Sequence, residues 1–228
     1  MSSSELNYRD KLMLNWNEID TVLLDMDGTL LDLAYDNHFW LEHIPRAYAD
    51  HHGIEPEIAK QQLIQTMESV KGQLEWYCID HWSDVLGFDV GYHVQATRSQ
   101  VAARPFALEF LNFLREQSKH VLMVTNAHTV VLDNKMEEVN LRPYFDSLIS
   151  SHHYASPKED LAFWSRLVQD FPMDTTRTLL IDDNEQVLAA AQRFGIKHLV
   201  TLKQPDSSLA PRTRSNYAAI THFDEILI

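Results

Sequence analysis

The sequence has a single cysteine and no long apolar run, and each shortage excludes a class of protein. Cys78 is the only cysteine among 228 residues, so no disulfide can form within the chain. There is no apolar signal sequence and no run of about 18 apolar residues of the kind that spans a membrane. We therefore expect a soluble cytoplasmic protein without a membrane partner, and the sequence leaves its oligomeric state open.

Positive charge is also scarce. Lysine and arginine total 19 against 33 aspartates and glutamates, which gives a formal net charge of −14. A surface this acidic is unsuited to binding the phosphate backbone of a nucleic acid over a broad area. We expect no nucleic-acid partner, and an anionic substrate would have to be attracted by a local group of cations.

The stretch from Thr21 to Leu30, TVLLDMDGTL, is the feature around which we interpret the rest. Its first four residues carry no charge and include β-branched Thr and Val, a pattern typical of a strand buried on both faces. Asp25 and Asp27 follow at once, in a position where parallel sheets bind ligands, and Gly28 lets the chain turn. Acids so close together repel unless a divalent cation lies between them, and oxygen ligands without nearby His or Cys suit Mg²⁺.

The pattern becomes helical between residues 33 and 103. Helices are predicted at 36–52, 55–70, 74–86 and 92–102, separated by glycines. After residue 104, strands and helices alternate again, which is typical of a doubly wound parallel sheet. We therefore expect an α/β fold, with a Rossmann-like core made of residues 1–32 and 104–228 and a helical cap domain at 33–103.

The second half of the chain supplies the other predicted strands, at residues 121–125, 147–150, 178–181 and 196–202. Pro105 is placed in the first turn of a helix that continues to Leu114. Ser156 and Glu159 are interpreted as a capping box that begins another helix. Beyond Pro205 we expect polar chain that wraps over the surface.

Polar side chains stand where the predicted strands end. Thr125 and Asn126 follow the second strand, Lys158 follows the third, and Asp182 with Asp183 follows the fourth. If the first strand is central, these residues meet its two acids at one edge of the sheet. Attack of a carboxylate on a phosphate dianion needs a divalent ion, a fixed ammonium and hydrogen-bond donors for the equatorial oxygens. The set therefore predicts phosphoryl transfer with Mg²⁺ as the cofactor.

In order and spacing, this set resembles the four motifs of phosphatases of the haloacid dehalogenase superfamily. The residues that carry the resemblance are Asp25-x-Asp27-Gly-Thr29, Thr125-Asn126, Lys158 and Asp182-Asp183. The resemblance implies the core fold of that superfamily, with the helical insertion as a cap in the first position. One departure is that the two acids of the last motif are adjacent, whereas many members have Gly-Asp and a further Asp some residues later.

The resemblance also implies a role for each residue. Asp25 would be the nucleophile that forms an aspartyl-phosphate, and Asp27 would protonate the leaving oxygen and then activate water. Thr125 would hold the phosphoryl group, and Lys158 would neutralise its charge. Mg²⁺ would be bound by the side chain of Asp25, the backbone carbonyl of Asp27 and Asp183, with Asp182 in support.

Two stretches of the insertion resemble bacterial GMP/IMP 5′-nucleotidases of the same superfamily, namely residues 35–40 (YDNHFW) and 75–82 (EWYCIDHW). The resemblance implies a small phosphorylated substrate, a purine nucleoside 5′-monophosphate. Most of the aromatic residues are expected in the core of the cap, although such rings can also stack on a purine. The residues that we expect at the substrate are Asp36, Asn37, His38 and Asn126. The pairs His51–His52 and His152–His153 are expected to be solvated, because neither has the convergent partners of a zinc site.

Other functions use similar residues. A sugar-phosphate phosphatase or a phosphomutase of the same superfamily has the same core, and a mutase differs in whether cap closure excludes water. A dehalogenase would need neither the second acid of the first motif nor the metal. A phospho-accepting signalling receiver also gathers acids, Thr or Ser, and Lys around Mg²⁺, but it is much shorter and has no helical cap.

Overall fold

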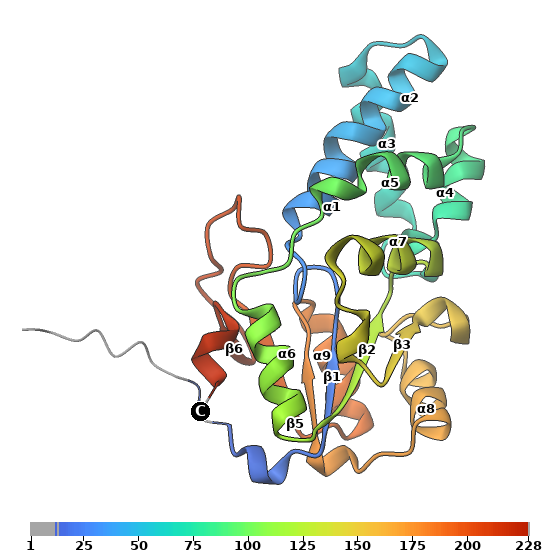
Figure 1. Ribbon diagram of the computed structural model, residues 1–228. Helices are drawn as coiled ribbons and strands as arrows, with labels where there is room; N and C mark the ends of the chain where they lie inside the picture. Colours follow the sequence, from blue (N-terminus) through green and yellow to red (C-terminus); the bar gives the residue numbers. More distant parts are fainter. Residues whose placement is uncertain (1–11, 13, 228) are drawn as a thin grey trace, which may run out of the picture.

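The computed structural model describes residue 12 and residues 14–227, and within them six strands form one parallel sheet (Figure 1). In chain order the strands are β1 (Thr21–Leu24), β2 (His120–Thr125), β3 (Ser147–Ser150), β4 (Thr178–Ile181), β5 (His198–Leu202) and β6 (Ala218–Ile220). Their order in space is β3-β2-β1-β4-β5-β6, so β2 and β4 flank β1, which is the condition under which the polar residues that follow these strands meet. Residues 1–11, 13 and 228, which we assigned to the core, lie outside the described part.

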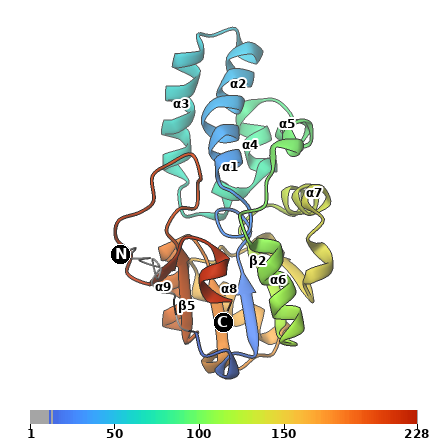
Figure 2. The same ribbon diagram turned by 60° about the vertical axis from the view of Figure 1, so that its left-hand side comes forward.

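Helices cover both faces of this sheet (Figure 2). One face packs against α6 (Ala107–Glu116), α7 (Thr129–Val139) and a 3-10 helix (Phe223–Ile226), and the other against α8 (Leu161–Asp170) and α9 (Glu185–Phe194). Side chains of β1 alternate between the two apolar clusters, because successive residues of a strand point to opposite faces. Val22 and Leu24 belong to one cluster and Leu23 to the other, and all three are fully buried. The predicted doubly wound α/β fold is confirmed.

Between β1 and α6 the chain forms a group of helices beyond the carboxyl edge of the sheet (Figure 1). They are α1 (Ala34–His38), a π-helical turn (Phe39–His43), α2 (Ile44–His52), α3 (Pro56–Ser69), α4 (Ile79–Leu86) and α5 (Val90–Thr97), with 3-10 turns at Leu74–Tyr77 and Arg98–Gln100. The helix predicted for 74–86 is interrupted at Cys78, which has an extended backbone and whose Sγ caps α4 by accepting the N–H of His81. The helix predicted for 92–102 begins at Val90 and ends in the second 3-10 turn. We call residues 33–103 the insertion.

The predicted start of α6 at Pro105 is wrong. The helix begins at Ala107, because Phe106 adopts a left-handed backbone conformation with φ 64°. Arg104 explains this delay, since its buried guanidinium donates to the carbonyl oxygens of Pro205 and Thr221 and so fixes the chain before the helix.

The predicted capping box at Ser156 and Glu159 is also wrong. Residues 157–160 form turns, and α8 begins only at Leu161. The turn is held by Asn126, whose Oδ1 accepts the N–H of Lys158 at 2.9 Å, and by Trp164, whose Nε1 donates to the carbonyl oxygen of Lys158 at 2.7 Å. These contacts bury Lys158 instead of placing it on a helix.

The C-terminal segment is more regular than expected. Residues 218–220 form β6 and extend the sheet beyond β5. Phe223 then stacks on Phe110 of α6, with ring centroids 4.7 Å apart. The expectation of a polar segment wrapped over the surface therefore missed an edge strand and a buried aromatic contact.

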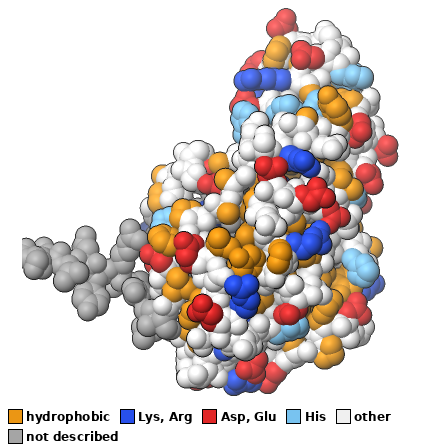
Figure 3. Space-filling view, in the orientation of Figure 1, with side chains coloured by type: hydrophobic (Ala, Val, Ile, Leu, Met, Phe, Trp, Pro, Cys, Tyr) orange, Lys and Arg blue, Asp and Glu red, His pale blue; other side chains and the backbone are white. Residues whose placement is uncertain are grey.

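The described surface carries charges of both signs. On the face drawn in Figure 3, acidic side chains are spread over the insertion and the core, with basic side chains between them. Among the described residues, no helix has the length and apolar character needed to cross a membrane.

Candidate active site

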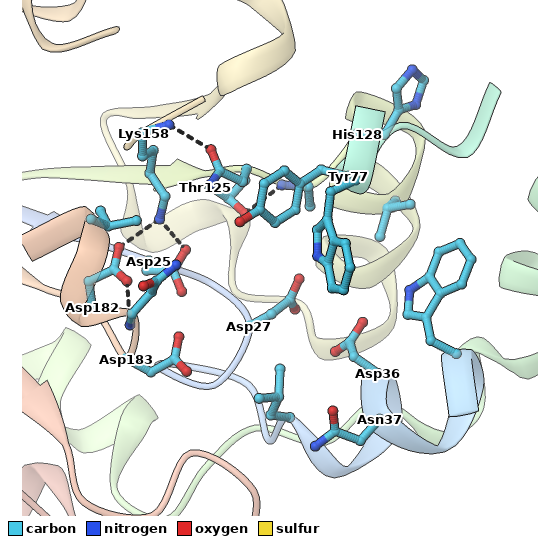
Figure 4. A pocket seen from close by; sticks show the side chains of 18 of the residues that line it. Asp25, Asp27, Asp36, Asn37, Tyr77, Thr125, His128, Lys158, Asp182 and Asp183 are labelled. Atoms are coloured by element: carbon cyan, nitrogen blue, oxygen red, sulfur yellow. Dashed lines mark hydrogen bonds and ion pairs between the residues drawn. The ribbon is translucent and has the colours of Figure 1, made fainter. Parts of the chain in front are cut away.

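The centre of the site is a pair of buried carboxylates joined by a lysine (Figure 4). The sheet pairs Leu24 of β1 with Ile181 of β4, so the residues that follow them, Asp25 and Asp182, lie next to each other. Nζ of Lys158 donates to Asp25 Oδ1 at 2.6 Å and to Asp182 Oδ2 at 2.7 Å. Lys158 is only 2% exposed and Asp25 only 6%. The structure thus brings together residues from three separate strand ends.

Burial makes the charged forms of these side chains unfavourable and shifts their pKa values. Desolvation raises the pKa of Asp25 well above its usual value and also raises the pKa of Asp182, although Lys158 opposes both shifts. Burial by itself would lower the pKa of Lys158, but the two carboxylates outweigh it and raise that pKa. Lys158 therefore keeps its positive charge between the two acids.

A third acid completes a group that can hold a divalent cation. One carboxylate oxygen from each of Asp25, Asp182 and Asp183 lies within 4.8 Å of the others. Burial, reinforced by repulsion from Asp182, raises the pKa of Asp183 to about 7. Two buried acids and the half-buried Asp183 face only Lys158 and Arg212, so negative charge is in excess, and an all-oxygen donor set suits Mg²⁺. The residues present therefore fit the expected ion.

The two adjacent acids differ in their availability to a metal. Asp182 uses one oxygen for Lys158 and the other for the N–H of Asn184, at 2.9 Å. The carboxylate of Asp183 instead has Nη2 of Arg212 at 3.6 Å, a longer contact. This difference favours Asp183 as the direct ligand, with Asp182 in support.

Gly28 allows Asp183 to come close to the first motif. Its φ is +79°, which side-chain-bearing residues rarely adopt, and a Cβ built there would lie 2.7 Å from Cγ of Asp183. Any side chain at this position would therefore push the acid out of place.

We expect Gly28→Ala to lower kcat/KM at least about tenfold and to weaken the apparent affinity for Mg²⁺, because displacement of one ligand costs at least about 1.4 kcal/mol. The matched control is Gly72→Ala, since Gly72 has the same φ of +79° with nothing within 4 Å of the added Cβ. Both variants bear the strain of a positive φ, and Gly28→Ala should lose more stability in thermal unfolding because of its clash with Asp183. Equal kcat/KM values for the two variants would show that the contact with Asp183 has no part in activity.

At the end of β2, the two predicted residues have different surroundings. Thr125 Oγ1 accepts the N–H of Ala127 at 3.1 Å, which leaves its own O–H free to donate into the site. Asn126 donates from Nδ2 to Glu159 Oε2 at 2.9 Å, while its Oδ1 accepts the N–H of Lys158. Asn126 lines the pocket, but both ends of its amide support the loop that carries Lys158.

Asp27 is held by a lysine that the sequence reasoning missed. Nζ of Lys135, on α7, lies 2.7 Å from Asp27 Oδ1 and 2.6 Å from Asp36 Oδ1, and Lys135 is only 1% exposed. Burial raises the pKa of Asp36 to about 7, with repulsion from Asp27 adding to the effect and Lys135 opposing it. One detectable signal was that Lys135 shares a helical face with the buried Leu132 and Met136, an unusual place for a lysine.

Other site residues were also missed. Glu159 accepts hydrogen bonds from Tyr77 of the insertion at 2.9 Å and from Asn184 at 3.2 Å, in addition to Asn126. Arg212 donates from Nη1 to the carbonyl oxygen of Asp183 at 2.6 Å. No local sequence pattern indicates these contacts, because each joins residues that are far apart in the chain.

The acids open into a pocket of about 720 Å³ between the insertion and the core. Its wall includes Trp40, Trp76 and Tyr77 together with Asp36 and Asn37. Figure 4 shows Asp36 and Asn37 on the same side of the pocket as Asp27.

The residues expected at the substrate are not all placed alike. Asn37 lines the pocket and donates from Nδ2 to Asp206 Oδ2 at 2.6 Å. His38 is exposed and is not part of the pocket wall. The structure therefore brings Asp36 and Asn37, but not His38, to the pocket.

The two histidine pairs also differ. His51 and His52 are exposed, as expected. His152 is half-buried and lies beside Cys78 and His128, so the expectation that it is solvated and has no convergent partners is wrong. These three residues are far apart in the sequence, and only the fold assembles them.

Comparison with known proteins gives a consistent picture. A family model described as haloacid dehalogenase-like hydrolase matches residues 19–195. The chain is 35% identical over 212 residues to the GMP/IMP nucleotidase YrfG of Escherichia coli (strain K12), and the match covers 93% of this chain and 96% of that protein. A GMP/IMP nucleotidase from Shigella flexneri matches equally well.

Solved structures share the fold at lower identity. The HAD phosphatase from Thermococcus onnurineus is 15% identical, has a TM-score of 0.75 and covers 92% of this chain and 94% of its own. CbbY from Rhodobacter sphaeroides, in complex with phosphate, is 12% identical with a TM-score of 0.64 and coverage of 88% and 92%. The L-2-haloacid dehalogenase from Xanthobacter autotrophicus is 14% identical with a TM-score of 0.57 and coverage of 83% and 80%. At these identities the likeness concerns the fold alone.

Proposed function

The chain belongs to the haloacid dehalogenase-like hydrolase family, and from this membership we propose that it is a Mg²⁺-dependent phosphomonoesterase that acts on purine nucleoside 5′-monophosphates, with IMP and GMP preferred. The observation that carries the proposal is the buried Asp25 between Lys158 and Asp183, at the bottom of a pocket with aromatic walls. The 35% identical GMP/IMP nucleotidase supports both the phosphatase activity and the assignment of guanine or hypoxanthine as the nucleobase of the substrate.

The first chemical step is assigned to Asp25. Its carboxylate attacks the phosphorus atom and forms an aspartyl-phosphate, and the bond from phosphorus to the nucleoside 5′-oxygen breaks. Asp27 gives a proton to that leaving oxygen, and it later removes a proton from the water that hydrolyses the intermediate. Lys135 holds Asp27 in place and offsets the negative charge left on it after the proton transfer.

Lys158 and Thr125 prepare the nucleophile and the phosphoryl group. Lys158 has all three donors engaged, with Asp25, Asp182 and the carbonyl oxygen of Val124 at 3.0 Å. We therefore assign to it the orientation of Asp25 and the supply of positive charge, rather than a direct hydrogen bond to the substrate. The hydroxyl of Thr125 donates to an equatorial phosphoryl oxygen.

The metal is assigned to Asp25, Asp183 and the backbone carbonyl of Asp27, with Asp182 in support. When bound there, Mg²⁺ would neutralise charge on the phosphoryl oxygens and lower the repulsion between phosphate and carboxylate. In this assignment the adjacent Asp182 and Asp183 would take the place of the more widely spaced acids of many superfamily members.

We assign residues 33–103 to a cap domain and residues 1–32 with 104–228 to the catalytic core. The pocket lies between the two parts, and Tyr77 of the insertion meets Glu159 of the core at its wall. A phosphate-binding core recognises little beyond the phosphate, so the choice of substrate falls to the insertion.

Asp36 is the residue that favours a 6-oxopurine over adenine as the base of the substrate. Its Oδ2 is buried and has no hydrogen-bond partner among the described residues, while Oδ1 is bound by Lys135. A carboxylate oxygen accepts the ring N–H that a 6-oxopurine presents and that adenine lacks. Adenine would leave a polar group unpaired, at a cost of about 1–3 kcal/mol. Trp40 and Trp76 provide apolar surface for the ring.

The test is a panel of IMP, GMP, AMP, a hexose phosphate and p-nitrophenyl phosphate, assayed with Mg²⁺ and with excess EDTA. We expect activity only with Mg²⁺ and kcat/KM for IMP and GMP at least about tenfold above that for AMP, as one unpaired group predicts. Asn37→Ala should narrow that ratio or raise KM, with less effect on p-nitrophenyl phosphate. Glu57→Ala, an exposed change on α3, is the control.

Each part of the proposal has its own contrary outcome. Equal kcat/KM for AMP and IMP would remove the preference for a 6-oxopurine and leave the phosphatase core in place. A hexose phosphate as the best substrate would favour the sugar-phosphate alternative, and isomerised product would identify a mutase. Full activity in excess EDTA would show that the reaction does not need Mg²⁺.

A further inference from the structure

A cysteine and two histidines meet where the insertion joins the core. Cys78 precedes α4 in the insertion, His128 precedes α7 after β2, and His152 follows β3. One ligand atom of each lies within 4.8 Å of the others. The rings of His128 and His152 are in edge contact, with centroids 4.9 Å apart. His128 also lines the active-site pocket.

One histidine of this group has a nitrogen without a protein partner. Nε2 of His152 is buried and has no hydrogen-bond partner among the described residues, which is costly for an imidazole without a ligand. Burial, followed by repulsion from His128, lowers the pKa of His152, so the ring is neutral at neutral pH. Nδ1 of His128 accepts the N–H of Val130 at 3.4 Å, so Nε2 carries the ring proton in this arrangement. Ligation through Nε2 moves that proton to Nδ1 and gives up this long hydrogen bond.

Asp80 can supply the fourth ligand, which is the only oxygen of the set. Oδ2 of Asp80 is 3.5 Å from Nε2 of His128, and Asp80 belongs to the first turn of α4, two residues after Cys78. A thiolate, two imidazoles and one carboxylate are the donors that Zn²⁺ binds in tetrahedral sites. Mg²⁺ prefers oxygen alone, so this set differs in kind from the acids around Asp25.

We propose that Cys78, His128 and His152, with Asp80 as the fourth ligand, form a binding site for Zn²⁺ or a similar soft divalent ion that fastens the insertion to the core at the rim of the pocket. On binding, the Cys78 thiol releases its proton to solvent and the sulfur becomes the anionic ligand. Two ligands come from the insertion and two from the core, so the ion restrains any movement of one part against the other. Occupancy should therefore slow substrate entry or product release.

The direct test uses Co²⁺ as a spectroscopic probe with the reduced full-length protein in excess Mg²⁺, which keeps the oxygen site filled. We expect one equivalent of Co²⁺ to give a thiolate-to-cobalt charge-transfer band in the near ultraviolet together with visible bands of tetrahedral intensity, and Zn²⁺ to abolish both. Cys78→Ser should remove the charge-transfer band, and His152→Ala should weaken Zn²⁺ binding at least about tenfold, the effect of losing about 1.4 kcal/mol of ligation.

The matched control is His153→Ala, because His153 is the exposed neighbour of His152 and lies outside the cluster. It should bind both ions like the wild type. Zn²⁺ should also raise the melting temperature of the wild type and of His153→Ala, but not that of Cys78→Ser, since a ligand that binds only the folded state stabilises it.

The proposal fails if the wild type gives no charge-transfer band, or if Cys78→Ser and His152→Ala bind Zn²⁺ as tightly as the wild type does. It also fails if His153→Ala loses affinity to the same extent. A Cys78→Ala variant repeats the test should the serine variant unfold, and circular dichroism in the absence of metal shows which variants are folded. None of these readouts depends on the substrate of the enzyme.

Discussion

Replacing Asp25 with asparagine should abolish turnover and leave the fold intact. An amide cannot form the acyl-phosphate, and loss of the covalent route should cost several orders of magnitude in kcat. The change keeps the size and shape of the side chain and removes one buried acid whose pKa burial raises. Lys158 retains Asp182 as an ionic partner, so we expect no large loss of stability.

The measurement is release of inorganic phosphate from IMP, with protein purified apart from host phosphatases. Acid quenching of the wild type with labelled substrate should trap a phosphorylated protein, and Asp25→Asn should trap none. The control is Asp20→Asn, an exposed acid on the same segment, which pairs with Arg177 away from the pocket. Activity of Asp25→Asn above about a tenth of wild type would exclude Asp25 as the nucleophile.

Lys158→Met should be nearly as damaging, for two separable reasons. Methionine fills much of the same volume but removes the charge that holds Asp25 against Asp182. We expect kcat to fall at least about a hundredfold, which corresponds to about 2.7 kcal/mol of transition-state stabilisation, with a smaller change in KM. Apparent Mg²⁺ affinity should persist, because the three acids remain.

The same variant should lose stability in a pH-dependent way. Removing one partner of a buried ion pair costs about 3–5 kcal/mol, since uncompensated charge stays in the interior. Burial already holds the pKa values of Asp25 and Asp182 above their usual values. The folded state therefore binds more protons than the unfolded state, so stability is retained at low pH and is lost as pH rises through the raised pKa values.

Thermal unfolding between pH 5 and pH 8 provides the check. The difference in melting temperature between wild type and Lys158→Met should grow as the pH increases, in buffers without divalent ions. Lys71→Met, a change at an exposed lysine of the insertion, should show no such trend. A difference independent of pH would mean that lost packing, and not uncompensated charge, causes the destabilisation.

The catalytic edge of the sheet could be predicted from local patterns. An uncharged run such as Thr21–Leu24 is typical of a strand that is buried on both faces. Its abrupt end at two acids marks the carboxyl end of a parallel strand. The same reasoning located β2 and β4, and right-handed crossovers then place the polar residues that follow them at one edge. The doubly wound fold followed from this, because the alternation of strands and helices is a regular pattern along the chain.

Element starts and the C-terminal edge strand were decided by contacts between distant segments. Arg104 is fixed by the chain near residues 205 and 221, and this delays α6 to Ala107. Lys158 is drawn into the interior by Asp25 and Asp182, and this moves the start of α8 to Leu161. Local preferences at Pro105 and Ser156 pointed to earlier starts, and tertiary interactions outweighed them.

The sequence by itself thus determined which polar residues meet at the carboxyl edge of the sheet, because their types and their positions after strands are local properties. Only the tertiary structure decided that Lys135 reaches Asp27, that His38 lies outside the pocket, and that Cys78 meets His128 and His152. The physical reason is that such contacts join separate elements. They depend on how the insertion packs on the core, and no repeat in the sequence records that packing.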